Sequence, residues 1–87
     1  MNLELILDFL QRENIRATYG AVAGVLGGIP QGVMLDREKS QRNSWVVNAE
    51  TGTPTGYRTE SLHPNLTRLP IVLNNREKLQ RFLNKHI

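Results

Sequence analysis

The segment that decides the fold is Ala17-Thr18-Tyr19-Gly20-Ala21-Val22-Ala23-Gly24-Val25-Leu26-Gly27-Gly28. Thr18 is a good helix N-cap, because its hydroxyl can accept a hydrogen bond from a free amide of the first turn. An apolar stripe follows, and two glycines then end the run. So short a helix is typical of the first half of a helix-turn-helix motif. It places Tyr19 at the exposed N-terminal end, where a phenol can meet a phosphate or a base.

The length and composition limit the classes of protein that fit. The 87 residues are too few for two cores, so we expect a single domain, 1–87. The absence of cysteine excludes disulfides, thiolate zinc sites and a cysteine nucleophile. His63 and His86 lack metal-ligand spacing, so no metal and no cofactor are expected. Without a membrane-spanning apolar run or a signal pattern, the sequence predicts a cytoplasmic protein with no membrane partner.

The charge is mildly basic and unevenly distributed. The formal net charge is +3 and the calculated pI is near 9.8. Acidic residues dominate within 1–14, whereas residues 71–87 carry Arg76, Lys78, Arg81 and Lys85 against Glu77. A bias of this size permits nucleic-acid binding but does not require it. The helix dipole alone would favour Lys85 in the last turn of a helix.

Periodicity predicts three helices in the first half of the chain. Apolar residues at three- and four-residue spacing predict an amphipathic helix over 2–13, and 14–17 is a short connector. The second helix covers 18–26. Pro30 suits the first turn of a third helix over 30–39, although Gly32 costs this helix about 1 kcal/mol relative to alanine.

The second half changes period. Trp45-Val46-Val47 predicts a strand, and the turn residues of 50–56 predict a β-hairpin that ends near Tyr57, with a wing over 48–57. Residues 62–66 suggest one helical turn, and 69–73 an extended segment. Asn74 or Asn75 caps a last helix. Three helices, a β-hairpin wing and a C-terminal helix predict an α+β winged helix-turn-helix.

Two elements carry a resemblance to a known family. The segment from Ala17 to Ala23 resembles the Thr-Thr-Tyr-Gly-x-[Leu/Val]-Ala element of the C-terminal DNA-binding domain of alkylguanine-DNA alkyltransferases and of their cysteine-less relatives, the alkyltransferase-like proteins. Trp45-Val46-Val47-Asn48, followed by Gly52 and Gly56-Tyr57, is similar to the active-site segment and wing of that family. The resemblance covers roughly residues 3–57.

The resemblance implies a mechanism of base flipping in duplex DNA. A tyrosine at the helix start presses on a phosphate and helps to rotate a base out of the duplex, and an arginine on the recognition helix fills the vacated space. Tyr19 lies at the tyrosine position, between Thr18 and Gly20. The arginine position falls near Gln31, which carries no charge. The cysteine position falls at Asn43 or Ser44, neither of which can accept an alkyl group, so alkyl transfer is excluded.

Further candidates have two interpretations each. Trp45 is either a pocket or base-stacking residue or, more simply, an anchor of the core. Arg37, Lys39 and Arg42 either meet phosphates or, because Asp36 and Glu38 interrupt them, form a solvated face with local ion pairs.

The leading hypothesis is a non-enzymatic protein that binds double-stranded DNA and senses alkylated or distorted bases. The DNA-binding residues would be Thr18, Tyr19, Gly20, Gln31, Arg37, Arg42, Asn43, Ser44 and Trp45. The alternative is a protein–protein interaction module that has lost DNA binding. An enzyme with a pocket near Trp45 and Tyr57 ranks far behind, because no catalytic constellation has usable spacing.

Overall fold

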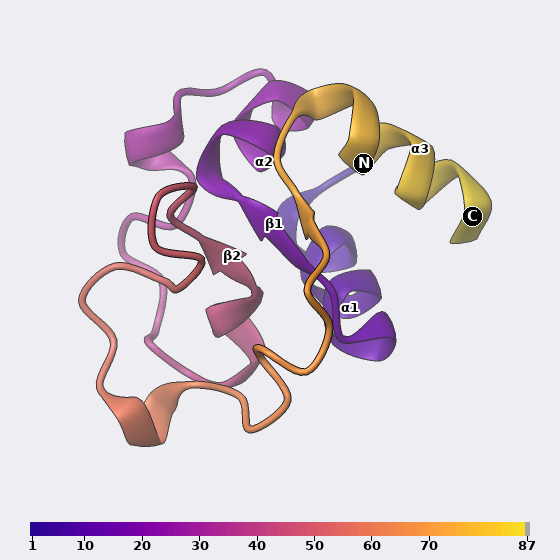
Figure 1. Ribbon diagram of the computed structural model, residues 1–87. Coiled ribbons are helices and arrows are strands. Elements are labelled where there is room, and N and C mark those ends of the chain that lie inside the picture. The colour runs from indigo at the N-terminus through magenta and orange to yellow at the C-terminus, as the bar shows by residue number, and fades with distance from the viewer. Residues whose placement is uncertain (87) are drawn as a thin grey trace.

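A parallel three-stranded sheet and three α-helices make up the protein, as described by a computed structural model for residues 1–86 (Figure 1). The fold is therefore of the α+β kind. In chain order the helices and strands are α1 (Leu3–Glu13), β1 (Arg16–Thr18), α2 (Tyr19–Leu26), β2 (Val46–Val47), β3 (Val72–Leu73) and α3 (Arg76–His86).

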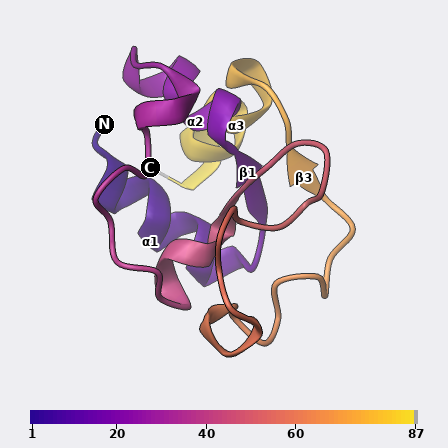
Figure 2. The same ribbon diagram turned by 90° about the vertical axis from the view of Figure 1, so that its left-hand side faces the viewer.

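The sheet has the strand order β2-β1-β3, and both pairs are parallel. Ala17 is paired with Val46 on one side, and Arg16 is paired with Val72 on the other. Figure 2 shows β1 and β3 side by side. The predicted connector over 14–17 is therefore wrong in its second half, because Arg16–Thr18 is the central strand.

The ends of the helices follow their capping residues. Asn2 accepts a hydrogen bond from the Leu5 amide at 3.0 Å, and Thr18 accepts one from the Ala21 amide at 3.1 Å. Asn75 does the same for Lys78 at 2.9 Å. Gly27 ends α2 in the left-handed conformation, with φ of 79°, which glycine adopts without steric cost. The helices predicted over 2–13, over 18–26 and at the C-terminus are confirmed.

The core lies between the sheet and the three helices. Its completely buried side chains include Ile6, Leu7 and Leu10 of α1, and Leu79 and Leu83 of α3. Trp45 is also completely buried. α3 packs chiefly against α2, and at their crossing an added Cβ on Gly24 would lie 2.8 Å from the Cβ of Arg76. Among residues 1–86, no helix has the length and apolar character needed to cross a membrane.

The third helix predicted over 30–39 does not form. Only Pro30–Gly32 takes a single 3-10 turn, and irregular turns follow. Gly32 weakens a helix here, and the chain leaves helical geometry at Asp36, whose φ of 63° lies in the left-handed region. Leu35 on this segment is 69% exposed, so little apolar burial stabilises a helix here.

The predicted β-hairpin is also wrong. Trp45 ends a 3-10 turn over Arg42–Trp45, and β2 pairs with β1 rather than with a strand near Tyr57. Residues 48–57 form a loop without a strand. Within it the Asn48 amide donates a hydrogen bond to the Thr53 carbonyl at 2.9 Å. β1 and β2 are both buried, so their pairing can satisfy backbone groups that would otherwise lie unpaired in the interior, whereas a hairpin with the partly exposed residues near Tyr57 would not bury them in this way.

Residues 58–71 continue the long connection from β2 to β3. It contains a 3-10 turn over Thr59–Ser61. The single helical turn predicted over 62–66 is not a helix, although a hydrogen bond from the Leu66 amide to the His63 carbonyl at 3.0 Å closes a turn there. The extended segment predicted over 69–73 is confirmed in part, because it contains β3.

Candidate functional site

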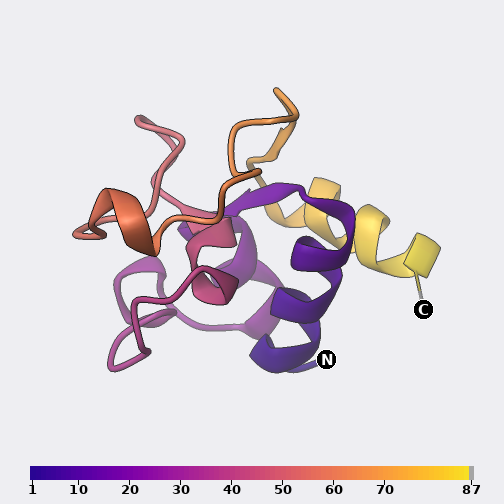
Figure 3. The ribbon, with the colours of Figure 1, turned by 90° about the horizontal axis from the view of Figure 1, so that it is seen from below.

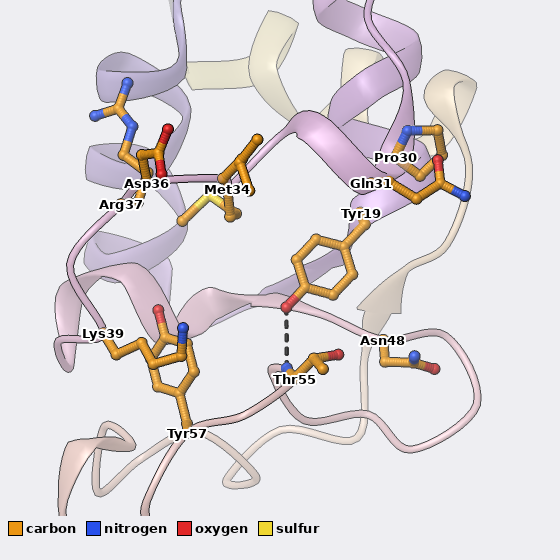
Figure 4. Close-up of a pocket in the computed structure, with 11 residues that line it drawn as sticks. Tyr19, Pro30, Gln31, Met34, Asp36, Arg37, Lys39, Asn48, Thr55 and Tyr57 are labelled. Atoms are coloured by element: carbon orange, nitrogen blue, oxygen red, sulfur yellow. Dashed lines mark hydrogen bonds between the residues drawn. The ribbon is translucent and has the colours of Figure 1, made fainter.

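One pocket of about 730 Å³ opens where three segments meet: the N-terminus of α2, the segment 30–39 and the loop 48–57 (Figure 4). This volume falls in the range of small-molecule sites, roughly 300–1,000 Å³. The pocket is lined by Tyr19, Pro30, Gln31, Met34, Leu35, Asp36, Arg37, Lys39, Asn48, Thr55 and Tyr57.

Tyr19 connects two walls of this pocket. It is the first residue of α2, and its hydroxyl accepts a hydrogen bond from the Thr55 amide at 3.0 Å (Figure 4). The phenol is therefore held across the pocket, with its ring partly buried. Thr18, directly before it, is 3% exposed and is engaged in capping α2. Gly20, directly after it, is exposed on the first turn.

Tyr57 is the second phenol of the pocket. Burial, and to a smaller extent the nearby Tyr19, raise the pKa of Tyr57 to about 12. Its phenol therefore keeps its proton at neutral pH and can donate a hydrogen bond. The Lys39 ammonium lies 5.8 Å from the centre of the Tyr57 ring, within cation–π range. Figure 4 shows the two side chains next to each other.

Arg37 and Arg42 are paired with acidic side chains of α1. Arg37 forms an ion pair with Glu4, and Arg42 lies 2.9 Å from Glu4 and 2.7 Å from Asp8. Arg37, and then Arg42, hold the pKa of Glu4 below its usual value through hydrogen bonds. Both arginines are partly neutralised, which corresponds to the local ion-pair interpretation, but their partners come from α1 rather than from the neighbouring Asp36 and Glu38.

Asn43, Ser44 and Trp45 lie inside the protein and do not line the pocket. The Asn43 amide group donates to the Glu38 carbonyl at 2.8 Å. The Ser44 hydroxyl donates to the Gln41 carbonyl at 2.6 Å and accepts from the His63 amide at 3.1 Å. Trp45 packs with its ring centre 4.8 Å from that of His63. All three side chains hold the chain between the 30–39 segment and β2 in place.

Of the nine residues predicted to bind DNA, three line the pocket: Tyr19, Gln31 and Arg37. Gln31 is exposed at the rim. Sequence reasoning did not select Met34, Asn48 and Thr55 for this site, because no pattern in the chain marks them. The enzyme hypothesis places a pocket near Trp45 and Tyr57. Tyr57 lines the observed pocket, whereas Trp45 does not.

Arg16 is a positioning residue that the sequence did not reveal. It is 9% exposed, and its guanidinium donates to the Gly52 carbonyl at 2.9 Å and to the Leu69 carbonyl at 3.0 Å. Gly52 belongs to the loop 48–57, which supplies Asn48, Thr55 and Tyr57 to the pocket. Arg16 therefore fixes one wall of the pocket from inside the sheet.

Within residues 1–86 no group of three or more His, Cys, Asp or Glu side chains could hold a metal ion. Comparison with known proteins gave no match, whether to a family model, to a curated protein or to a solved structure.

Proposed function

We propose that this chain is a non-enzymatic DNA-binding protein of the alkyltransferase-like type, which senses alkylated or distorted bases without repairing them. The observation that carries the proposal is the pocket beside the N-terminus of α2. Tyr19, singled out from the sequence as a residue for phosphate or base contact, forms part of its wall together with Gln31 and Tyr57.

The chemistry of the pocket suits an extrahelical base. Two phenol rings offer flat surfaces for stacking, and the side chains of Gln31 and Asn48 offer both hydrogen-bond donors and acceptors. A base outside the stack is read by such contacts to its edge and faces. In this proposal the segment 30–39 and the loop 48–57 take the places of the recognition helix and the wing of a winged helix.

The proposal that the chain is not an enzyme rests on the residues at the position where the alkyltransferases carry their nucleophilic cysteine. Asn43 and Ser44, at the place of the family's cysteine, are buried and engaged in hydrogen bonds. Neither carries a nucleophile of thiolate reactivity.

The alternative, a protein–protein interaction module, is favoured by a different observation. Leu35 on the segment 30–39 is 69% exposed, and Ile29, directly before this segment, is 67% exposed. The cationic side chains of Arg37 and Arg42 nearby are paired with carboxylates. An apolar surface with neutralised charge suits a protein partner better than a phosphate backbone.

A titration with two duplexes tests the proposal. Backbone amide shifts are followed while a 15-base-pair duplex is added, first with guanine and then with O6-methylguanine at its centre. We expect shifts at Tyr19, Gln31 and Thr55, and tighter binding of the duplex with the lesion. Tyr19→Ala should abolish the preference for the lesion, whereas Leu5→Ala, an exposed apolar residue of α1, serves as the matched control.

The outcomes separate the two hypotheses. Equal affinity for both duplexes at low salt would remove the sensing function. No shifts with either duplex would remove DNA binding altogether and favour the interaction module. A loss of lesion preference in both variants would show that the pocket is not responsible.

A further inference from the structure

The whole net charge of the chain is concentrated on α3. Seven basic and seven acidic side chains precede Arg76, so residues 1–75 are neutral on balance. α3 then contributes four basic side chains against the single carboxylate of Glu77. The formal charge of +3 therefore belongs to one helix.

Three of these cations form one exposed row, which we call the α3 stripe: Lys78, Arg81 and Lys85. Their spacing of three and four residues places them on the same side of the helix. The opposite side of α3, with Leu79, Phe82 and Leu83, is buried in the core. Within residues 1–86, no carboxylate forms an ion pair with the α3 stripe.

Four basic side chains outside α3 are occupied, whereas Arg12, Lys39 and Arg68 are exposed without an ion pair to the described carboxylates. Arg37 and Arg42 are paired with α1, and Arg58 lies 3.9 Å from Glu60. Arg16 is buried against two carbonyls. The α3 stripe thus combines high exposure with positive charge that no neighbouring carboxylate in the described part of the chain offsets.

From this distribution we infer that the α3 stripe is a phosphate-backbone binding surface, separate from the pocket, and that its partner is DNA. The inference rests on the proposed function for the identity of the polyanion. Seven helical residues span about 10 Å. Phosphates follow one another at about 3.4 Å along the axis of each DNA strand, so three cations over this length match about three phosphates.

A membrane surface fits the α3 stripe less well. Helices that bind in the membrane interface insert an apolar face between the lipids. In α3 this face packs on α1 and α2 and is not available. Only the charged side is free, which suits a polyanion that is bound through its phosphates.

The α3 stripe and the pocket are far apart. α3 lies at one end of the molecule, and the segments that line the pocket lie at the other (Figures 1 and 3). The longest dimension of the protein is 31 Å. Because the two surfaces do not share residues, each can be disabled without the other.

The test compares two triple variants with equal loss of charge. The first carries Lys78→Gln, Arg81→Gln and Lys85→Gln, and the control carries Arg12→Gln, Arg58→Gln and Arg68→Gln, which are exposed elsewhere. Fluorescence anisotropy with a labelled, undamaged 20-base-pair duplex gives the affinity between 50 and 200 mM salt. Each phosphate contact contributes about −0.9 to the slope of log affinity against log salt concentration. Three contacts through the α3 stripe therefore predict that the affinity of the wild type falls about 40-fold between 50 and 200 mM salt.

The expected result is that the α3 variant binds more weakly at 50 mM salt and loses that part of the salt dependence, while the control variant changes less. Circular dichroism verifies that both variants fold, and Lys78→Arg with Lys85→Arg should retain binding. Equal affinity and slope in both triple variants would overturn the inference but leave the lesion preference of the pocket intact. The inverse result, stripe-dependent binding without lesion preference, would refute only the sensing function. Binding to anionic vesicles or polyglutamate but not to the duplex would refute both.

Discussion

The crossing of α2 and α3 at Gly24 permits a quantitative prediction about packing. An added Cβ would lie 2.8 Å from the Cβ and 3.3 Å from the Cγ of Arg76. These atoms are close to the backbone of α3, so the helix itself must move. Overpacking of this kind costs about 1–3 kcal/mol. Replacement of a helical glycine by alanine recovers up to about 1 kcal/mol.

Gly20 provides the matched control in the same helix. Its added Cβ would meet only the Thr18 hydroxyl oxygen at 4.0 Å, an ordinary contact. Gly20→Ala should therefore keep or slightly raise the free energy of unfolding. Because the gain in helix propensity is common to both substitutions, the difference between the two variants isolates the overpacking term, about 1–3 kcal/mol in favour of Gly20→Ala.

Urea denaturation with thermal melting measures this difference. For a domain of this size, 1 kcal/mol corresponds to about 4–8 °C in Tm. The double variant Gly24→Ala with Arg76→Gly should recover much of the loss of Gly24→Ala relative to Arg76→Gly alone, because glycine removes the atoms that clash. Equal stability of Gly24→Ala and Gly20→Ala would refute the reasoning.

Three other substitutions test the interior and the pocket. Arg16→Met should lower the free energy of unfolding by about 2 kcal/mol, because the half-buried carbonyls of Gly52 and Leu69 lose charged donors; full stability in urea would contradict this. Tyr57 should titrate near pH 12 by ultraviolet absorbance. Because its folded pKa lies above the unfolded value of 10.0, its contribution to the free energy of unfolding is complete below pH 10 and is lost as the pH rises to 12. Tyr57→Phe should lose this pH dependence of stability. The folded pKa of Glu4 is lowered from 4.5, so its contribution to the free energy of unfolding is present above pH 4.5 and is lost as the pH falls further. Glu4→Gln should therefore reduce the loss of stability in acid. An unchanged loss of stability in acid would contradict the ion pairs with Arg37 and Arg42.

Local signals predicted the helices well. The N-cap at Thr18, the apolar periodicity of α1 and the glycines after α2 each act within one or two turns, and a sequence displays such short-range effects directly. The third helix was predicted wrongly although one local signal against it, Gly32, is visible in the sequence; the left-handed conformation of Asp36 is visible only in the structure.

The sequence does not reveal through such local signals which strands pair with one another in the sheet. The turn residues between Glu50 and Gly56 do form a turn, but the strand before it pairs with β1, which lies far away in sequence. A strand of two residues carries too little pattern to reveal its neighbour. The burial of Arg16 depends on that same topology, because Gly52 and Leu69 approach it only after the sheet has formed.

For the candidate site, the sequence identified the residue at the start of α2 but not the shape around it. Tyr19 and Gln31 line the pocket as neighbours in space, whereas Asn43, Ser44 and Trp45 are enclosed. The segment 43–47 is buried throughout, so it has no polar–apolar alternation from which the sequence could reveal that Asn43 and Ser44 face the interior.

The central position of β1 has a consequence for the order of folding. β1 precedes both of its partners in the chain, because its first partner comes only at Val46 and its second only at Val72. Non-local pairings of this kind carry a large loop-closure entropy and slow the rate-limiting step. Until β3 has been synthesised, one edge of β1 stays open to pairing with other chains. We therefore expect substitutions in β3 to slow folding and to raise aggregation of the nascent protein, even where the folded state tolerates them.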